Sequence, residues 1–244
     1  MPRYKATIEY LGTGLSGFQT QANAPSVQEF IESSIEKFSH EKVTIYAAGR
    51  TDAGVHAYGQ VIHFDLEKHI EPHIALRALN HFLKPNISVI SCEIAEEDFH
   101  ARFSAKKRHY LYRILNRESD SAIDQNRIWH VKHPLDVSAM IKASEYLIGM
   151  HDFTSFRCSA CQAKSPVKTI SKIDISKVED EVHFRISAPS FLHNMVRNIV
   201  GTLVMVGTSK WKIEDVKTAL EAKDRRAAGP TAPAHGLYFM KVDY

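Results

Sequence analysis

Apolar and polar residues alternate along several short segments of the chain, with the period of two that is typical of half-buried β-strands. The alternation predicts strands at residues 3–10, 43–48, 60–66, 87–94, 109–115, 167–176, 181–188 and 237–242. Several of these segments follow one another with no helical segment between them. The pattern therefore predicts an α+β fold with a largely antiparallel sheet and helices on one face.

Helical spacing of apolar residues predicts the remaining elements. The first helix begins at a capping-box pattern, Ser26 to Glu29, and further helices are expected at 72–83, 136–148, 191–206 and 213–222. Turn residues near 118–125, followed by Pro134, mark the best candidate boundary between two halves of the chain. We therefore expect an N-terminal half, residues 1–117, and a C-terminal half, residues 118–244.

The composition is that of an ordinary globular protein, with 44% hydrophobic and 24% charged residues among 244. No apolar stretch has the length of a membrane span, and the first residues lack the apolar core of a signal peptide. The three cysteines are an odd number, which is typical of a reducing compartment. These features predict a cytoplasmic protein with no membrane partner.

Gly12, Gly14 and Gly17 match the glycine spacing of dinucleotide-binding loops and follow a predicted strand. In such folds the third glycine opens a helix, whereas here the next helix begins only after Ser26. We therefore expect these glycines to shape a loop. A nucleotide-dependent dehydrogenase or kinase is the weaker alternative.

The motif around Asp52, residues 48–56, lies between two apolar strands. Small residues on both sides of Asp52 would let a substrate approach the backbone closely, and Arg50 would favour the ionised carboxylate. The competing interpretation is a simple turn in which Asp52 binds its own backbone.

Basic residues gather in the segment 100–117, interleaved with aromatic ones and with no carboxylate among them. The cations are Arg102, Lys106, Lys107, Arg108, Arg113 and Arg117. Cations for phosphates and aromatic faces for bases are typical of an RNA-binding surface, although the net charge of +3 does not itself indicate one. A strand kept soluble by its charge explains the cations equally well.

The predicted helix around Arg197 has an apolar stripe and an unusual opposite face. That face carries short hydrogen-bonding groups and one arginine, which suggests a polar cleft, with plain solvent exposure as the alternative. The scattered histidines and the isolated Cys158 to Cys161 pair do not form a metal-ligand pattern.

Five motifs occur in an order that identifies a family resemblance. They are AGRTDAGVH at 48–56, DFHARFS at 98–104, DFTSFR at 152–157, MVRNIVG at 195–201 and G-L-Y at 236–238. Together they closely resemble the tRNA pseudouridine synthase A (TruA) family, and the similarity runs from Tyr4 to Tyr244.

The resemblance implies an isomerase that converts uridine to pseudouridine at positions 38, 39 and 40 of the tRNA anticodon stem-loop, with no cofactor and no metal. It implies two related halves sharing the sheet, an RNA-binding cleft between them, and a homodimer that binds tRNA and not DNA. Asp52 matches the catalytic nucleophile and Arg197 the arginine that pairs with it. Tyr110 matches the tyrosine that stacks on the target base. Arg50 matches an arginine near the flipped nucleotide, and Leu237 an apolar residue of the pocket.

The chain departs from the family pattern at Leu11, where aspartate is usual, and at Phe18, where tryptophan is usual. The departures bear on which tRNAs and positions are used. A non-catalytic RNA-binding protein built on the same basic strand is the rival functional hypothesis.

Overall fold

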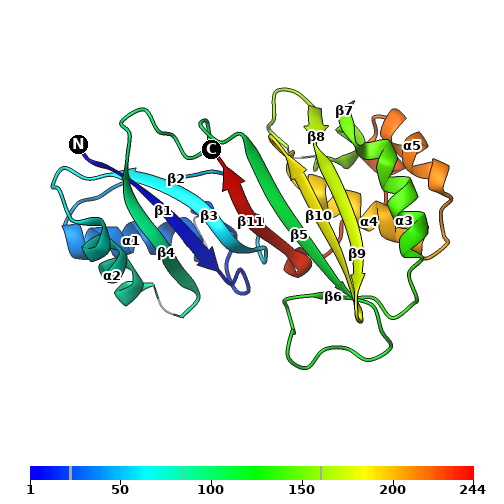
Figure 1. The fold of residues 1–244 in the computed structure, drawn as a ribbon, viewed down its shortest axis with the longest axis horizontal. Coiled ribbons are helices and arrows are strands. Elements are labelled where there is room, and N and C mark those ends of the chain that lie inside the picture. The colour runs from blue at the N-terminus through cyan, green and yellow to red at the C-terminus, as the bar shows by residue number, and fades with distance from the viewer. Residues whose placement is uncertain (22–23, 84, 160) are drawn as a thin grey trace. The chain divides into compact units, whose positions relative to one another are not determined.

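The computed structural model describes residues 1–21, 24–83, 85–159 and 161–244. Strands and helices combine in an α+β fold, which confirms the predicted fold class (Figure 1). The chain forms two compact units, a first unit of residues 1–106 with 238–244 and a second unit of residues 107–237. They differ from the expected halves in their boundary and in the return of the C-terminal strand to the first unit.

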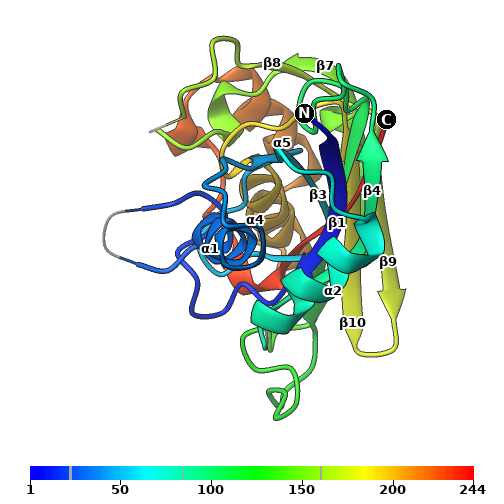
Figure 2. The ribbon, with the colours of Figure 1, turned by 90° about the vertical axis from the view of Figure 1, so that its left-hand side faces the viewer.

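The first unit contains a sheet with the strand order β4-β1-β3-β11. β1 pairs antiparallel with β3 and with β4, whereas β11 pairs parallel with β3, where Tyr238 lies opposite His56. The two helices of this unit lie on one face of the sheet (Figure 2). Its elements are β1 (Arg3–Tyr10), α1 (Val27–Ser39), β2 (Tyr46–Ala47), β3 (His56–Asp65), α2 (Pro72–Phe82), β4 (Ile87–Ala95) and β11 (Leu237–Asp243).

Alternate residues of β1 build the core of the first unit, as the period of two predicts. Tyr4, Ala6 and Ile8 are fully buried, and the Tyr4 ring stacks on Phe64 of β3. Ser26 caps α1, because its hydroxyl oxygen accepts a hydrogen bond from the Glu29 amide. Burial and capping therefore both follow the sequence pattern here.

The second unit contains a sheet with the order β5-β10-β9, in which both pairs are antiparallel. A separate two-stranded sheet joins β7 and β8, and α4 lies behind β9 and β10 in Figure 1. Its elements are β5 (Lys107–Leu115), β6 (Trp129–His130), α3 (Val137–Ser144), β7 (Gly149–Asp152), β8 (Val167–Ile170), β9 (Lys172–Val178), β10 (Glu181–Ala188), α4 (Met195–Gly207) and α5 (Ile213–Glu221).

Several predicted elements end or begin elsewhere than expected, among them β3, which begins at His56 and not at residue 60, and α3, which ends at Ser144 and not at residue 148. The strand expected at 167–176 is divided at Ser171, because β8 pairs with β7 whereas β9 pairs with β10. The helix expected from residue 191 begins at Met195, since Asn194 has a left-handed backbone with φ 63°. The strand expected at 43–48 is reduced to β2. Alternation shows which side chains are buried but not which strand they pair with.

No helix among the described residues has both the length and the apolar character that crossing a membrane requires.

Candidate functional site

The loop that carries Asp52, residues 49–55, joins β2 to β3 in the first unit and is called the aspartate loop below. Asp52 is half-buried, while Arg50 and Ala53 beside it are exposed. The Val55 amide donates to the Asp52 carbonyl at 3.1 Å, so the chain turns sharply at the aspartate. This turn is closed by main-chain atoms, whereas the competing turn inferred from the sequence uses the Asp52 carboxylate.

Thr51 fixes the aspartate loop from the side of β1. The Tyr10 hydroxyl lies 2.8 Å from the Thr51 hydroxyl, and the Phe18 amide donates to the Thr51 carbonyl at 3.0 Å. Tyr10 is buried, and burial raises the pKa of its phenol to about 12, so the hydroxyl stays neutral. From the β3 side, the Gln60 amide nitrogen donates to the Gly49 carbonyl at 2.7 Å. The residue directly before Asp52 is thus held by two partners.

The glycine-rich segment 11–18, called the glycine loop below, packs directly on the aspartate loop. A Cβ on Gly17 would lie 2.7 Å from the Thr51 carbonyl oxygen, and one on Gly12 would collide with the Val55 carbonyl. Gly17 also has φ +100°, which L side chains rarely adopt. The glycines therefore allow two backbones to touch, and α1 begins well beyond them at Val27.

The two departures from the family pattern lie at the ends of the glycine loop. Phe18 is buried, and its ring lies 6.4 Å from the Tyr10 ring. Leu11 is 38% exposed, and its amide donates to the Asn86 carbonyl. Phe18 therefore helps to support the aspartate loop, whereas the apolar side chain of Leu11 is exposed to solvent.

The other predicted site residues lie in the second unit. The Tyr110 ring on β5 is half-buried and meets the Phe191 ring edge to face at 5.1 Å. Leu237 is buried and follows Gly236, which has no Cβ and therefore fits against the Tyr112 ring. Glycine is required at 236 by this close approach.

Arg197 is held by the chain that runs antiparallel to its helix. Its Nε donates to the Ala232 carbonyl at 2.8 Å, its Nη1 donates to Asn194 Oδ1 at 3.1 Å, and the Ala232 amide donates back to the Arg197 carbonyl. The segment 228–236 thus docks on α4 at the arginine.

Part of the polar face predicted from the sequence packs inside the protein, whereas His193 on the same face is exposed. Asn198 is fully buried, and its Oδ1 accepts from Arg225 at 3.1 Å and from Thr231 at 2.7 Å. Gly201 contacts the Pro230 carbonyl so closely that no side chain fits. The apolar stripe on the other face is buried, as predicted. The short polar groups are explained by the segment 228–236 that they bind.

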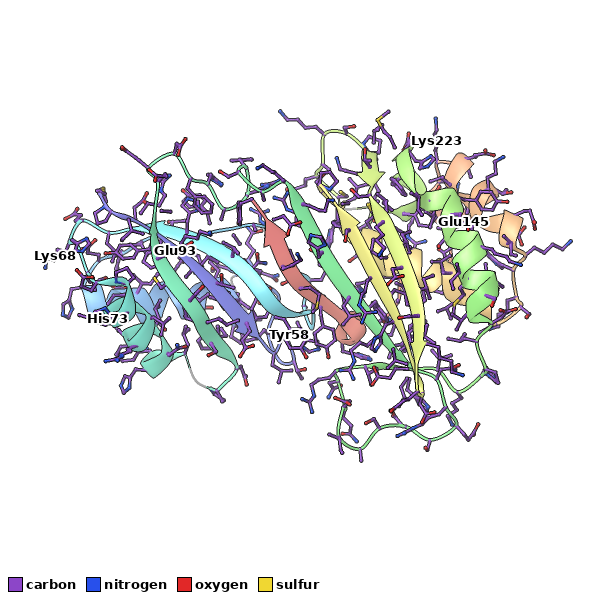
Figure 3. All side chains as sticks on the ribbon, in the orientation of Figure 1. Tyr58, Lys68, His73, Glu93, Glu145 and Lys223 are labelled. Carbon is purple, nitrogen blue, oxygen red and sulfur yellow. The ribbon has the colours of Figure 1, made fainter. Side chains whose placement is uncertain are left out.

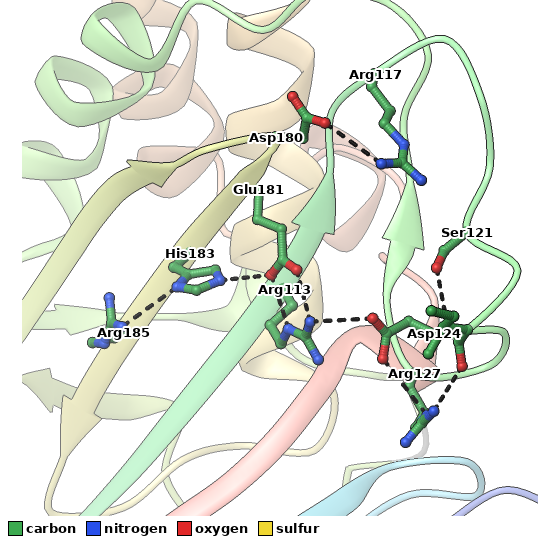
Figure 4. A network of polar contacts seen from close by, with 10 residues as sticks. Arg113, Arg117, Ser121, Asp124, Arg127, Asp180, Glu181, His183 and Arg185 are labelled. Carbon is green, nitrogen blue, oxygen red and sulfur yellow. Dashed lines mark hydrogen bonds and ion pairs between the residues drawn. The ribbon is translucent and has the colours of Figure 1, made fainter.

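The basic segment is less free than its sequence suggests, because carboxylates from elsewhere in the second unit pair with it. Arg113 makes two hydrogen bonds to Glu181, of 2.9 and 2.7 Å, and Arg117 lies 3.5 Å from Asp180 (Figure 4). Arg113 and His183 together hold the pKa of Glu181 below its usual value. Arg108 is buried and donates to the Pro189 carbonyl. Arg108, Arg113 and Arg117 thus all have structural partners.

Some of the described histidines bind backbone groups, as His56 binds the Gly12 amide and His63 the Ala101 amide. No group of three or more histidine, cysteine, aspartate or glutamate side chains there is arranged to hold a metal ion. His63 is buried, and burial lowers the pKa of its imidazole to about 4. Cys158 and Cys161 are half-buried thiols with no disulfide.

Sequence reasoning did not single out several residues that build these loops. His56 lies inside the Asp52 motif and accepts the Gly12 amide, so its presence in the motif was the available signal. Thr51 lies in the same motif, whereas Tyr10 carried no signal because its partner Thr51 is 41 residues away. Arg225 lies outside all five motifs.

Comparison with known proteins agrees with these observations. The family model described as tRNA pseudouridine synthase matches residues 6–104 and 143–244. Two proteins named tRNA pseudouridine synthase A, from two strains of Caulobacter vibrioides, are each 52% identical over 245 residues, covering 100% of this chain and 99% of theirs. Among solved structures, a chain of a Cbf5-Nop10-Gar1 complex has 14% identity and a TM-score of 0.38, with 97% of this chain and 48% of that chain covered. The match to the family model and the two full-length relatives show that the chain is an enzyme and belongs to the tRNA pseudouridine synthase family.

Proposed function

We propose that the chain isomerises uridine to pseudouridine at positions 38, 39 and 40 of the tRNA anticodon stem-loop, with Asp52 as the catalytic nucleophile. The observation that carries the proposal is the support of the aspartate loop by the glycine loop, Thr51 and Gln60. A carboxylate on a loop fixed at several points keeps its position when a substrate arrives, which catalysis requires. The exposed Ala53 beside it leaves the loop backbone open to a ligand.

The reaction breaks the N1–C1′ bond of uridine, turns the uracil and joins C5 to C1′; the C5 proton is released to solvent and N1 takes up a proton from solvent. Product and substrate therefore have the same composition, and no electrons are exchanged. A nucleophile that holds either the sugar or the base while the bond is broken is the group that the reaction needs most. Asp52 is the carboxylate proposed for this role.

The proposal gives substrate-binding roles to Tyr110, Arg50, Arg197 and Leu237. The target base must leave the helical stack, which costs a few kcal/mol, and stacking on an aromatic ring returns about 1–3 kcal/mol. Tyr110 is suited to this because Phe191 meets its ring edge to face. The exposed Arg50 is suited to a phosphate of the flipped nucleotide. In the same proposal, the enzyme works as a cytoplasmic homodimer.

The test is tritium release from unmodified tRNA labelled at uridine C5, with substrates that carry one uridine each at position 38, 39 or 40. We expect Asp52→Asn to lower release at least 1000-fold while tRNA binding persists, because only the carboxylate nucleophile is lost. Glu9→Gln removes an exposed carboxylate of β1 and serves as the matched control with unchanged release.

Full release by Asp52→Asn would remove the nucleophile from the proposal. Release only from a further labelled tRNA whose uridines all lie outside positions 38–40 would remove the assigned substrate positions.

A further inference from the structure

Two histidines of β3 perform the same structural task at opposite ends of the strand. His56 Nδ1 accepts a hydrogen bond from the Gly12 amide at 2.9 Å, and His63 Nδ1 accepts one from the Ala101 amide at 3.1 Å. Both side chains are 2% exposed. Because Nδ1 accepts in each case, it carries no proton there, and the two rings are alike in burial and in the atom that accepts.

His56 differs from His63 in the place of the amide that it binds, because the Gly12 amide belongs to the loop that contacts the aspartate loop. Gly12 is the glycine that contacts the Val55 carbonyl, and Gly17 of the same loop lies against the Thr51 carbonyl. Asp52 therefore lies between two points at which the glycine loop touches the aspartate loop. The His56 bond fixes the first of these points.

The ring of His56 is itself fixed by aromatic neighbours. Its centroid lies 4.9 Å from the Tyr238 ring, which stacks on Tyr58 at 5.3 Å and 17°. Tyr58, labelled in Figure 3, extends the row of rings to the surface of β3. The acceptor nitrogen is thus held in place before any substrate binds.

We propose that His56 is a positioning residue for Asp52, acting through the Gly12 amide and the glycine loop. This rests on the proposed function, since it assumes that Asp52 is the nucleophile. Loss of the acceptor leaves a buried amide without its partner, and the glycine loop then moves to reach water. A displacement of the nucleophile by about 1 Å is enough to lower the chemical rate about 100-fold.

The experiment compares single-turnover tritium release, KM and urea unfolding for His56→Leu, His56→Asn and His63→Leu. The asparagine Oδ1 takes the place of Nδ1, so His56→Asn keeps the acceptor, whereas leucine keeps only the apolar volume. We expect His56→Leu to lower the rate about 10- to 100-fold with KM changed less than about threefold, and His56→Asn to recover most of it. His63→Leu should lose similar stability at unchanged rate.

Equal rates for His56→Leu and His63→Leu would overturn the positioning role, as would failure of His56→Asn to act better than His56→Gln, whose amide reaches the place of Nε2. The glutamine variant also serves if His56→Leu does not fold. Failure of the proposed function gives a different result, because Asp52→Asn would then remain active. An inactive Asp52→Asn beside a fully active His56→Leu would reject the positioning role alone.

Discussion

The two units hold their candidate site residues by different means. In the first unit glycines of one loop touch carbonyls of another and Phe18 is bonded to Thr51 through main-chain atoms, in addition to side-chain bonds such as that of Gln60. In the second unit Arg225 and Arg197 donate to carbonyls of the segment 228–236, in addition to its backbone contact with Gly201. Backbone contact leaves no room for any side chain, whereas a side-chain network depends on particular donors.

This difference teaches where each unit tolerates change. The first unit should be sensitive to any added atom at Gly12 or Gly17, whatever its chemistry. The second unit should be sensitive to loss of a donor at a buried polar cluster, because the acceptors then remain without partners.

The largest effect is expected from Gly12→Ala. The added methyl group collides with the Val55 carbonyl, so the two loops must separate, and we expect a loss of about 3 kcal/mol in the free energy of unfolding together with most of the activity. Urea unfolding and tritium release measure the two losses.

Gly14→Ala is the control for this variant, because nothing lies within 4 Å of its missing Cβ although its φ is +79°. It should lose only about 1 kcal/mol from backbone strain. Equal losses for the two variants would show that strain, and not contact between the loops, dominates in the first unit.

A smaller effect is expected from Arg225→Met. The guanidinium donates to the Gly229 carbonyl at 2.9 Å, to Thr231 at 3.0 Å and to Asn198 at 3.1 Å, so its removal should cost about 2 kcal/mol. Urea unfolding measures the change.

The neighbouring Arg226→Met provides the matched comparison. Arg226 is 90% exposed and pairs only locally with Asp224 at 2.7 Å, so its loss should change the free energy of unfolding far less than the loss of Arg225 does. Similar values for the two arginines would contradict the role of Arg225 as the clamp of the segment 228–236.

The smallest effect on the free energy of unfolding is expected from a change of pH below neutral. It acts through a different residue in each unit. The pKa of His63 in the first unit is about 4, below its usual value of 6.5, so the unfolded chain binds the proton first as the pH falls. Stability should therefore decrease as the pH falls from 6.5 to 4, and His63→Asn should lessen this decrease.

Glu181 in the second unit behaves differently. Its lowered pKa stabilises the folded state above the usual value of 4.5, and this contribution is lost as the pH falls below it. Urea unfolding of Glu181→Gln, measured at several pH values, should therefore differ from that of the parent protein only above about pH 4.5. A change confined to pH 5–6.5 would contradict the assignment.

The sequence allowed accurate prediction where local pattern decides structure. The bounds of β1 and β10 match the alternation, and the cap of α1 is made by Ser26 as expected. The aspartate loop was found from its motif. Local pattern was sufficient in each case because the signal and the structure occupy the same few residues.

Contacts between distant segments escaped prediction. The pairing of Arg113 with Glu181 spans 68 residues, and its acid lies outside the basic segment that seemed to lack one. The glycines at 12 and 17 were correctly placed in a loop, but the backbone they touch lies about 40 residues further along. Which partner such residues meet depends on strand register, which alternation does not encode.

The return of β11 to the first unit has a consequence for the order in which the protein is made. Tyr238 pairs with His56, and the Tyr244 hydroxyl binds the Ala101 carbonyl, so residues 1–106 lack one strand of their sheet until 238–244 have been added. During synthesis the whole second unit emerges in between. The edge of β3 beside the aspartate loop is then exposed to other chains on the ribosome, and the first unit to be translated is the last to be completed.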